Sequence, residues 1–212
     1  MDAMLISIVL TGLGLGMLHA LDPDHVAAVM GSSAPGLKRE TEGRLMPVLR
    51  FGLHWAFGHG AAVVIVSLLV LLLGMATPVK LSMWAETAVG YTLVAIALAG
   101  FWRIYHQWRH HLPGKRVTGL APLVGLLHGL AGSAPLLALV PLSQLQQPIL
   151  GIAYVMLFSL GVAAGMLALL SLCGCVAHYA LGQRPIGFLV LQSFMAGFSL
   201  LVGMVLISGI AW

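Results

Sequence analysis

Long apolar segments alternate with short polar ones along the chain, and this pattern predicts membrane-spanning helices. The apolar segments cover about 3–30, 48–74, 82–105, 119–141, 149–180 and 186–211. A helix needs about 20 apolar residues to cross the hydrocarbon core of a bilayer, and each segment is at least that long. We therefore expect an all-α integral membrane protein with six transmembrane helices.

The composition also favours a membrane protein over a soluble one. Hydrophobic residues make up 60% of the 212 positions and charged residues only 8%, with a mean hydropathy of +1.02. Soluble domains carry roughly 25% charged residues, so the excess apolar surface is expected to face lipid. We expect a single transmembrane domain over 1–212, with a first half at 1–105, a cytoplasmic loop at 106–118 and a second half at 119–212.

The basic residues predict the orientation of the chain. Lys and Arg total 10, and all except Lys80 lie in or beside the loops after the first, third and fifth segments. Because positively charged loops remain in the cytoplasm, we expect these three loops to be cytoplasmic and both termini to lie outside a bacterial inner membrane. The same rule explains the net charge of +4, so no nucleic-acid partner is expected. Asp2 and the lack of a basic leader predict a retained first span rather than a secretory signal.

The two halves of the chain resemble each other. The matched segments are 16–21 with 125–130, 51–59 with 158–166 and, weakly, 90–91 with 197–198. Each half has three predicted spans, so the halves enter the membrane from opposite sides as two inverted three-helix repeats, a common plan in secondary transporters. The alternative is chance similarity among Gly- and Leu-rich helices. The shared order and the matched His19 and His128 argue against it.

The first apolar segment holds a dense group of ionisable residues, namely His19, Asp22, Asp24 and His25. Carboxylates within a span are costly unless they are paired, hydrated or bound to a cation. Pro23 interrupts the helix locally, and a broken helix at membrane depth is tolerated where it lines a cavity. Imidazole and carboxylate suit nickel, cobalt or zinc, so these four residues are predicted metal-site residues. The alternative is a loop of solvated charges at the cytoplasmic edge.

Three more histidines lie within predicted spans: His54 and His59 in the second, and His128 in the fourth. At a rise of about 1.5 Å per residue, His59 and His128 fall near the middle of the bilayer. Gly58 and Gly60 beside His59 permit another helix to approach closely. We predict that all three histidines belong to the metal site. The alternative is that they bond to backbone carbonyls in a helix interface.

Other polar side chains have simpler explanations. Glu86 interacts favourably with the start of its helix, and a proton-coupling role is the alternative. His106, His110 and His111 are expected on a solvated interfacial face, the alternative being that they collect metal. Trp and Tyr residues near the span ends are expected to anchor the chain at the membrane interfaces.

With these residues in view, the chain resembles the nickel/cobalt transporter family, especially its short six-span branch related to urease-accessory membrane proteins. The resemblance rests on His19-x4-Asp24-His25, supported by Phe-Gly-His at 57–59 and by 128–134. It implies transport of Ni²⁺ or Co²⁺ as substrate, without a prosthetic group. It also implies that His19, Asp24 and His25 are metal-site residues, and Asp22 and His59 carry over with them. Longer family members carry an acidic stretch where this chain has the apolar residues 161–166.

The expected function is therefore metal transport through a polar site between the first, second and fourth spans, with one half rocking against the other. The expected partners are a divalent metal ion and the lipid bilayer, then metalloenzyme maturation proteins and further copies of the chain. Two rivals are an exporter of another small ion and an accessory subunit that delivers metal without transporting it. An enzyme is not expected, because the chain lacks H-E-x-x-H and Ser133 lacks a nucleophile-elbow context.

Overall fold

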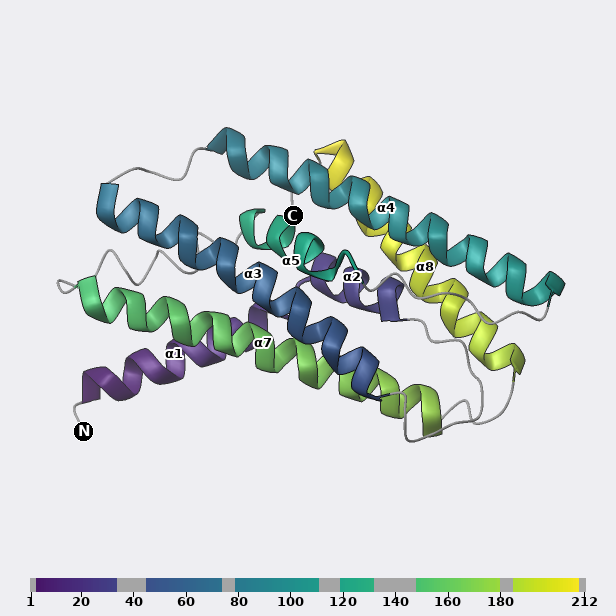
Figure 1. The fold of residues 1–212 in the computed structure, drawn as a ribbon, viewed down its shortest axis with the longest axis horizontal. Coiled ribbons are helices and arrows are strands. Elements are labelled where there is room, and N and C mark those ends of the chain that lie inside the picture. The colour runs from purple at the N-terminus through teal and green to yellow at the C-terminus, as the bar shows by residue number, and fades with distance from the viewer. Residues whose placement is uncertain are drawn as a thin grey trace.

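The structure is a computed structural model that describes residues 3–33, 45–73, 79–110, 119–131, 148–179 and 185–209. The secondary-structure elements in these ranges are all helices (Figure 1). The helices are α1 (Ala3–His19), α2 (Pro23–Ser33), α3 (Leu45–Leu73), α4 (Val79–His110), α5 (Ala121–Leu130), α7 (Pro148–Tyr179) and α8 (Pro185–Ser208). The expected all-α class is confirmed.

Four of the described helices are long and apolar enough to cross a membrane. Their candidate spans are Leu49–Val70 in α3, Ser82–His106 in α4, Ile149–Cys173 in α7 and Leu189–Ser208 in α8. The helices α1 and α2 form a bent pair that is long and apolar enough when taken together. Counting this pair as one span gives as many as five spans among the described residues. These helices make the chain an all-α membrane protein.

The span expected at 119–141 is described only in part. Its described helix, α5, has 10 residues, which is too short to cross a bilayer alone. The rest of that segment lies outside the described residues, so the six-span count and the inverted repeats stay predictions. The loop expected from residue 106 begins later than expected, because α4 continues to His110.

A break in the first span separates α1 from α2, as Pro23 predicted. Proline has no N–H with which to continue the hydrogen-bond ladder of α1. The backbone N–H of Asp22 bonds instead to the His19 carbonyl at 3.0 Å, and the N–H of Leu21 bonds to the Leu18 carbonyl at 2.9 Å. These tight turns end α1, and α2 leaves at an angle of 57°. The bend places polar backbone and acidic side chains beside the bundle interior.

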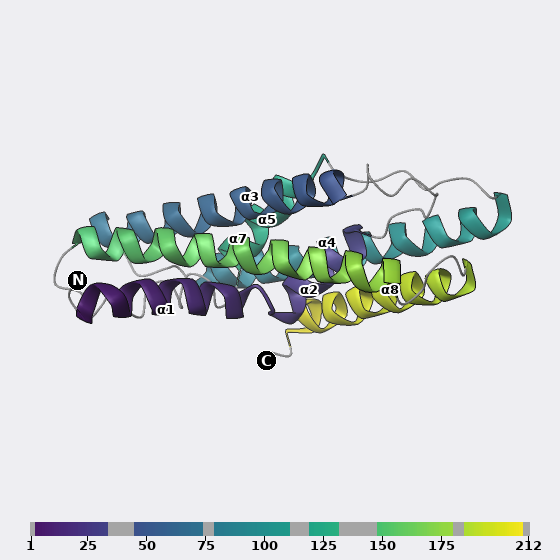
Figure 2. The same cartoon turned by 90° about the horizontal axis from the view of Figure 1, so that it is seen from below.

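Close backbone crossings fix the helices that carry the histidines. The helix α1 lies along α7, and α5 lies along α3 (Figures 1 and 2). A Cβ atom on Gly16 would overlap the Phe158 carbonyl oxygen of α7, and one on Gly125 would overlap the Trp55 carbonyl oxygen of α3. Small residues allow helix backbones to meet in this way in membranes. The first helix of each expected repeat thus packs on the second helix of the other.

The short helix α2 lies between α4, α8 and α7. Arg103 of α4 donates a hydrogen bond from Nη2 to the Gly31 carbonyl at 3.0 Å, which satisfies a carbonyl that the last turn of a helix leaves unpaired. Ser199 of α8 donates from Oγ to the Leu93 carbonyl of α4 at 3.1 Å. These two bonds tie α2, α4 and α8 together. They therefore hold α2 in place, including its first turn, which carries Asp24 and His25.

The described helix ends agree with the alternating course expected from the charges. The start of α3, the end of α4, the end of α7 and the start of α8 lie at one end of the molecule (Figure 1). Arg50 and Arg109 belong to that end, whereas Lys80 follows the opposite turn. Arg103 lies within α4, and the remaining predicted loop cations lie outside the described residues. The assignment of this end to the cytoplasm stays a prediction.

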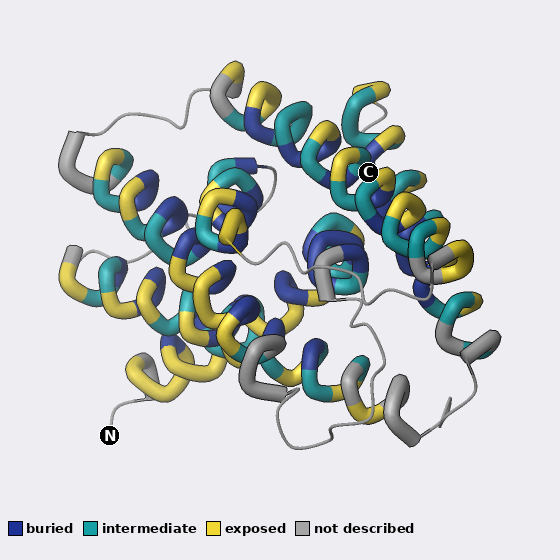
Figure 3. Tube along the Cα trace, turned by 45° about the vertical axis from the view of Figure 1, so that its right-hand side comes forward, coloured by how far each residue is buried: buried dark blue, intermediate teal, exposed yellow. Residues whose placement is uncertain are grey.

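The outer faces of the long helices carry large exposed apolar side chains. Exposed positions line the outside of the molecule, and buried positions gather inside (Figure 3). The most exposed of these side chains include Leu10, Phe57, Trp84 and Ile149. Such a surface suits hydrocarbon, and the buried interior contains the few polar groups described next.

Candidate metal centre

Four histidines from separate helices meet inside the bundle. They are His19 at the end of α1, His25 in α2, His59 in α3 and His128 in α5, and none is more than 3% exposed. One ring nitrogen from each of His19, His25 and His59 lies within 4.8 Å of the other two. The ring centroid of His128 lies 5.4 Å from that of His25. We call these four side chains the histidine cluster.

In three of these four rings, the Nδ1 atom lies close to an oxygen atom. The Nδ1 of His25 lies 3.0 Å from Oδ1 of Asp24, and the Nδ1 of His128 lies 2.7 Å from the Val124 carbonyl. A carbonyl or carboxylate acceptor requires the ring proton on Nδ1, and in a neutral imidazole this leaves the Nε2 lone pair free. The Nδ1 of His19 lies 2.8 Å from Oδ2 of Asp22, within ion-pair range.

Every ring in the histidine cluster has at least one nitrogen without a hydrogen-bond partner, and in His19 and His59 neither ring nitrogen has one among the described residues. Among the described residues, the Nε2 atoms of His19, His25, His59 and His128 are buried without a hydrogen bond. Buried polar atoms in proteins nearly always find partners, so four such atoms in one place require an explanation. Histidine metal ligands commonly bond one nitrogen to an oxygen acceptor and present the other to the metal. The histidine cluster has the donor chemistry to hold a transition-metal dication.

The two predicted acids lie beside the histidine cluster. The side chains of Asp22 and Asp24 are 37% and 22% exposed, and together with His25 they form a second group of ligand atoms within 4.8 Å of one another. Asp22 precedes α2 and Asp24 lies in its first turn, where the positive end of the helix dipole favours a carboxylate. Their negative charges can offset those of a dication.

His54 is the one predicted site residue that lies neither in the histidine cluster nor beside it. Its side chain is exposed, and its Nδ1 lies 2.6 Å from the Arg50 carbonyl. The reason is helical geometry, because His54 and His59 are five positions apart and so point about 140° away from each other. For His54 the backbone-bonded alternative describes the observed contact.

Trp55 belongs to the surroundings of the histidine cluster, a role that the sequence did not predict. Its side chain is fully buried, and its ring stacks on His59 with centroids 5.1 Å apart and planes at 19°. Its edge contacts are with His25 at 5.0 Å and with His128 at 5.6 Å. Its position one helical turn before His59 is the signal that could have indicated a shared face.

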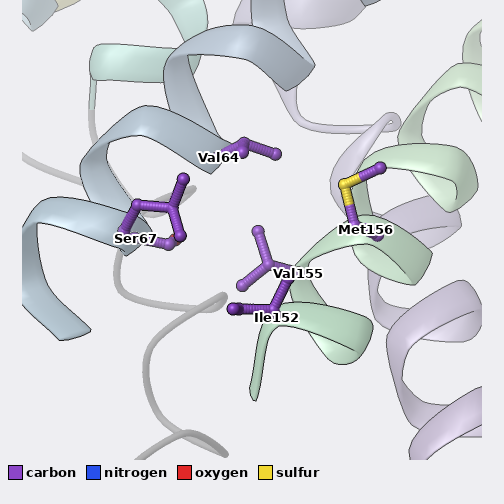
Figure 4. Close-up of a pocket in the computed structure, with 6 residues that line it drawn as sticks. Val64, Ser67, Ile152, Val155 and Met156 are labelled. Carbon is purple, nitrogen blue, oxygen red and sulfur yellow. The ribbon is translucent and has the colours of Figure 1, made fainter. Parts of the chain in front are cut away.

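A separate pocket lies between α3 and α7 (Figure 4). Its lining residues are Val64, Ser67, Leu68, Ile152, Val155 and Met156. Ser67 supplies the one hydroxyl of this lining, which has no imidazole, carboxylate or thiolate. The pocket therefore lacks the ligand chemistry found in the histidine cluster.

Comparison with known proteins gives two relatives and a negative result. No family model and no solved structure matches the chain. The chloroplast protein FOR GROWTH AND FERTILITY 1 of Arabidopsis thaliana is 30% identical over 177 residues, which cover 74% of this chain and 46% of that protein, so the chain spans about half of it. The urease accessory protein UreH of Bacillus sp. (strain TB-90) is 30% identical over 183 residues, which cover 80% of this chain and 77% of UreH. Given this identity and coverage, the chain belongs to the family of the urease accessory protein UreH.

Proposed function

We propose that the protein carries Ni²⁺ or Co²⁺ across a bacterial inner membrane and binds it at the histidine cluster on the way. The observation that carries this proposal is the group of four buried Nε2 atoms without partners. The name of the UreH relative connects the family to urease maturation, and the sequence motif resembles that of nickel/cobalt transporters. Both favour nickel or cobalt over other divalent metals.

Coordination would replace the waters of the hydrated ion with imidazole nitrogens. His19, His25 and His59 have ring nitrogens close enough to share one ion, and His128 lies next to them. Imidazole suits nickel, cobalt and zinc, so the donor set selects against calcium and magnesium, which prefer oxygen. Asp22 and Asp24 would serve as outer partners that orient His19 and His25 and offset the two positive charges. Protonation of the ligands would release the ion.

Transport would use two inverted three-helix repeats with the site where they meet. The packing of α1 on α7 and of α5 on α3 supports this proposal, because each pair joins opposite halves of the chain. Rocking of one half against the other would then open the site to alternate sides of the membrane. In this proposal the chain has six spans, both termini lie outside, and the loops after the first, third and fifth spans are cytoplasmic. No catalytic residue is assigned.

A second candidate function is delivery of metal to a metalloenzyme maturation complex without transport. The word accessory in the name of the UreH relative favours it. Both functions use the same metal site, so binding alone does not separate them. Movement of the ion across a sealed membrane does.

The experiment is nickel flux into proteoliposomes that contain the purified protein. We expect the wild type to move Ni²⁺ and His59→Ala to abolish movement, because His59 is buried in the histidine cluster. The matched control is His54→Ala on the same helix, which should retain flux because His54 points away from the cluster and bonds to the Arg50 carbonyl.

Three results would count against the proposal in different ways. Nickel binding without flux in the wild type would favour the delivery function. Flux of an unrelated small ion but not of nickel or cobalt would favour an exporter. Equal flux in wild type and His59→Ala, with both proteins folded, would remove the histidine cluster from the pathway.

A further inference from the structure

Trp55 closes one side of the histidine cluster. Its indole contacts His25, His59 and His128, while the ring of His19 contacts Phe158 of α7 with centroids 5.5 Å apart. Trp55 is among the largest fully buried side chains described in the protein. It is therefore a bulky apolar barrier directly against three of the four candidate ligands.

The position of Trp55 along α3 indicates which way it blocks. Gly125 of α5 packs on the Trp55 carbonyl, and Gly129 packs on the His59 carbonyl. The helices α3 and α5 thus run in the same direction, and Trp55 lies one turn nearer to their starts than His59 does. Helical side chains also lean towards the start of their helix. The indole accordingly separates the histidine cluster from the end of the bundle where α3 begins.

The indole is held by packing and not by a hydrogen bond. Among the described residues its Nε1 atom is buried without a partner, whereas a buried Trp usually bonds its N–H. Rotation of the ring away from His59 would therefore break no hydrogen bond, and water entering behind it would satisfy the N–H. An anchored indole would lose such a bond when it moved.

Indole nitrogen is a donor only, so Trp55 offers no ligand atom to a metal. Its contribution to this site is to exclude water and to obstruct the path. We propose that Trp55 is the gate of the histidine cluster on the α3 N-terminal side, and that the ion passes only when the indole swings aside. This inference rests on the proposed function, because it assigns a barrier to the same metal site.

If Trp55 is a gate, its removal should change the rates of Ni²⁺ binding and release but not the dissociation constant. Trp55→Ala should accelerate binding and release of Ni²⁺ by the same factor, at least about tenfold, which is about 1.4 kcal/mol of barrier. The dissociation constant should stay the same, since no ligand is lost. Trp55→Phe keeps an aromatic ring of smaller area and should give an intermediate acceleration. If Trp55→Ala leaves too large a cavity for the protein to fold, Trp55→Phe provides the variant for the same test.

The measurement uses purified full-length protein in detergent with nickel alone as the probe. Stopped-flow mixing with a nickel-chelating dye gives the release rate, and mixing with free Ni²⁺ gives the binding rate. The matched control is Trp84→Ala, whose side chain on α4 is 75% exposed, and its two rates should equal those of the wild type.

The results separate the gate from a packing role and from the proposed function. Faster binding and release with an unchanged dissociation constant support the gate. Unchanged rates in folded Trp55→Phe and Trp55→Ala would overturn it. A weaker dissociation constant with an unchanged binding rate would also overturn it, because it would indicate that Trp55 positions the ligands. Failure of the wild type to bind nickel would instead overturn the proposed function.

Discussion

At the residue scale, the acids and histidines of the first span act as pairs. Asp24 faces Nδ1 of His25 at 3.0 Å, and Asp22 faces Nδ1 of His19 at 2.8 Å. A carboxylate in this position helps to fix the orientation of the ring and leaves the other nitrogen for a metal ion. We infer that the two acids support the imidazole ligands more than they replace them. Substitutions of the acids and of the histidines should therefore differ in their effects.

We predict that Asp24→Asn weakens Ni²⁺ affinity about 10- to 100-fold without abolishing it, the range typical of an outer partner of a metal ligand. The amide oxygen can still accept from Nδ1 of His25, but the negative charge that offsets the dication is lost. Isothermal titration calorimetry at neutral pH measures the change. Glu86→Gln, which removes a half-buried acid of α4, is the control and should bind as the wild type does.

Removal of a histidine that binds the ion directly should weaken Ni²⁺ affinity more than removal of the acid beside it. We predict that His25→Ala, and independently His19→Ala, reduces Ni²⁺ affinity beyond the loss seen in Asp24→Asn while the protein remains folded. Calorimetry measures the affinity, and circular dichroism checks the helix content. Binding at the wild-type level in either variant would exclude that histidine from the ligand set.

Much of the site could be predicted from the sequence because its members are costly in hydrocarbon. His19, Asp22, Asp24, His25, His59 and His128 are all ionisable residues in apolar segments, and their side chains lie close together. Their role as a metal site stays a prediction. The orientation of His54 could also have been anticipated, since it cannot share a helix face with His59. The role of Trp55 could be predicted only in part. Its position one turn before His59 indicates a shared face, but only the packing of α2 and α5 brings His25 and His128 to it.

At the element scale, glycines decide how closely the helices that carry the histidines approach each other. A Cβ atom on Gly125 would meet the Trp55 carbonyl, whereas a Cβ atom on Gly197 of α8 would have no other heavy atom within 4 Å. The broken span was predictable from Pro23 because proline acts on the local hydrogen-bond ladder. The pairing of α5 with α3 was not, since it depends on contacts between distant segments.

The difference between Gly125 and Gly197 gives a prediction for adding one methyl group at each position. Gly125→Ala should destabilise the folded protein by about 1–3 kcal/mol, because the added methyl overlaps backbone that cannot move aside alone. Gly197→Ala should be neutral or slightly stabilising, since alanine favours helix by up to about 1 kcal/mol over glycine. Thermal unfolding in detergent measures both. A lower melting temperature for Gly197→Ala than for Gly125→Ala would contradict the packing.

At the scale of the whole molecule, the helix ends and the charges agree on an alternating course through the membrane. Arg50 and Arg109 lie at the end of the bundle where α3 begins and α4 stops, and Lys80 lies after the opposite turn. The residues that carry most of the predicted loop charge are not among those described. The side of the membrane therefore follows from the charge rule and not from the fold.

We predict that epitope tags at the N-terminus and the C-terminus are both accessible from outside intact spheroplasts. The basic loops would remain in the cytoplasm and hold this orientation. Antibody labelling before and after permeabilisation measures it, with a cytoplasmic protein as the control for leakage. Protection of both tags until permeabilisation would reverse the topology and place the Trp55 gate on the outer side.

The central claim is that the histidine cluster binds the dication through imidazole nitrogens. Nickel K-edge X-ray absorption on the purified protein tests it most directly. We predict a first shell with several imidazole nitrogens, which diminishes in His25→Ala and is unchanged in His54→Ala. A shell of oxygen ligands alone, or a spectrum that is the same in wild type and His25→Ala, would contradict it.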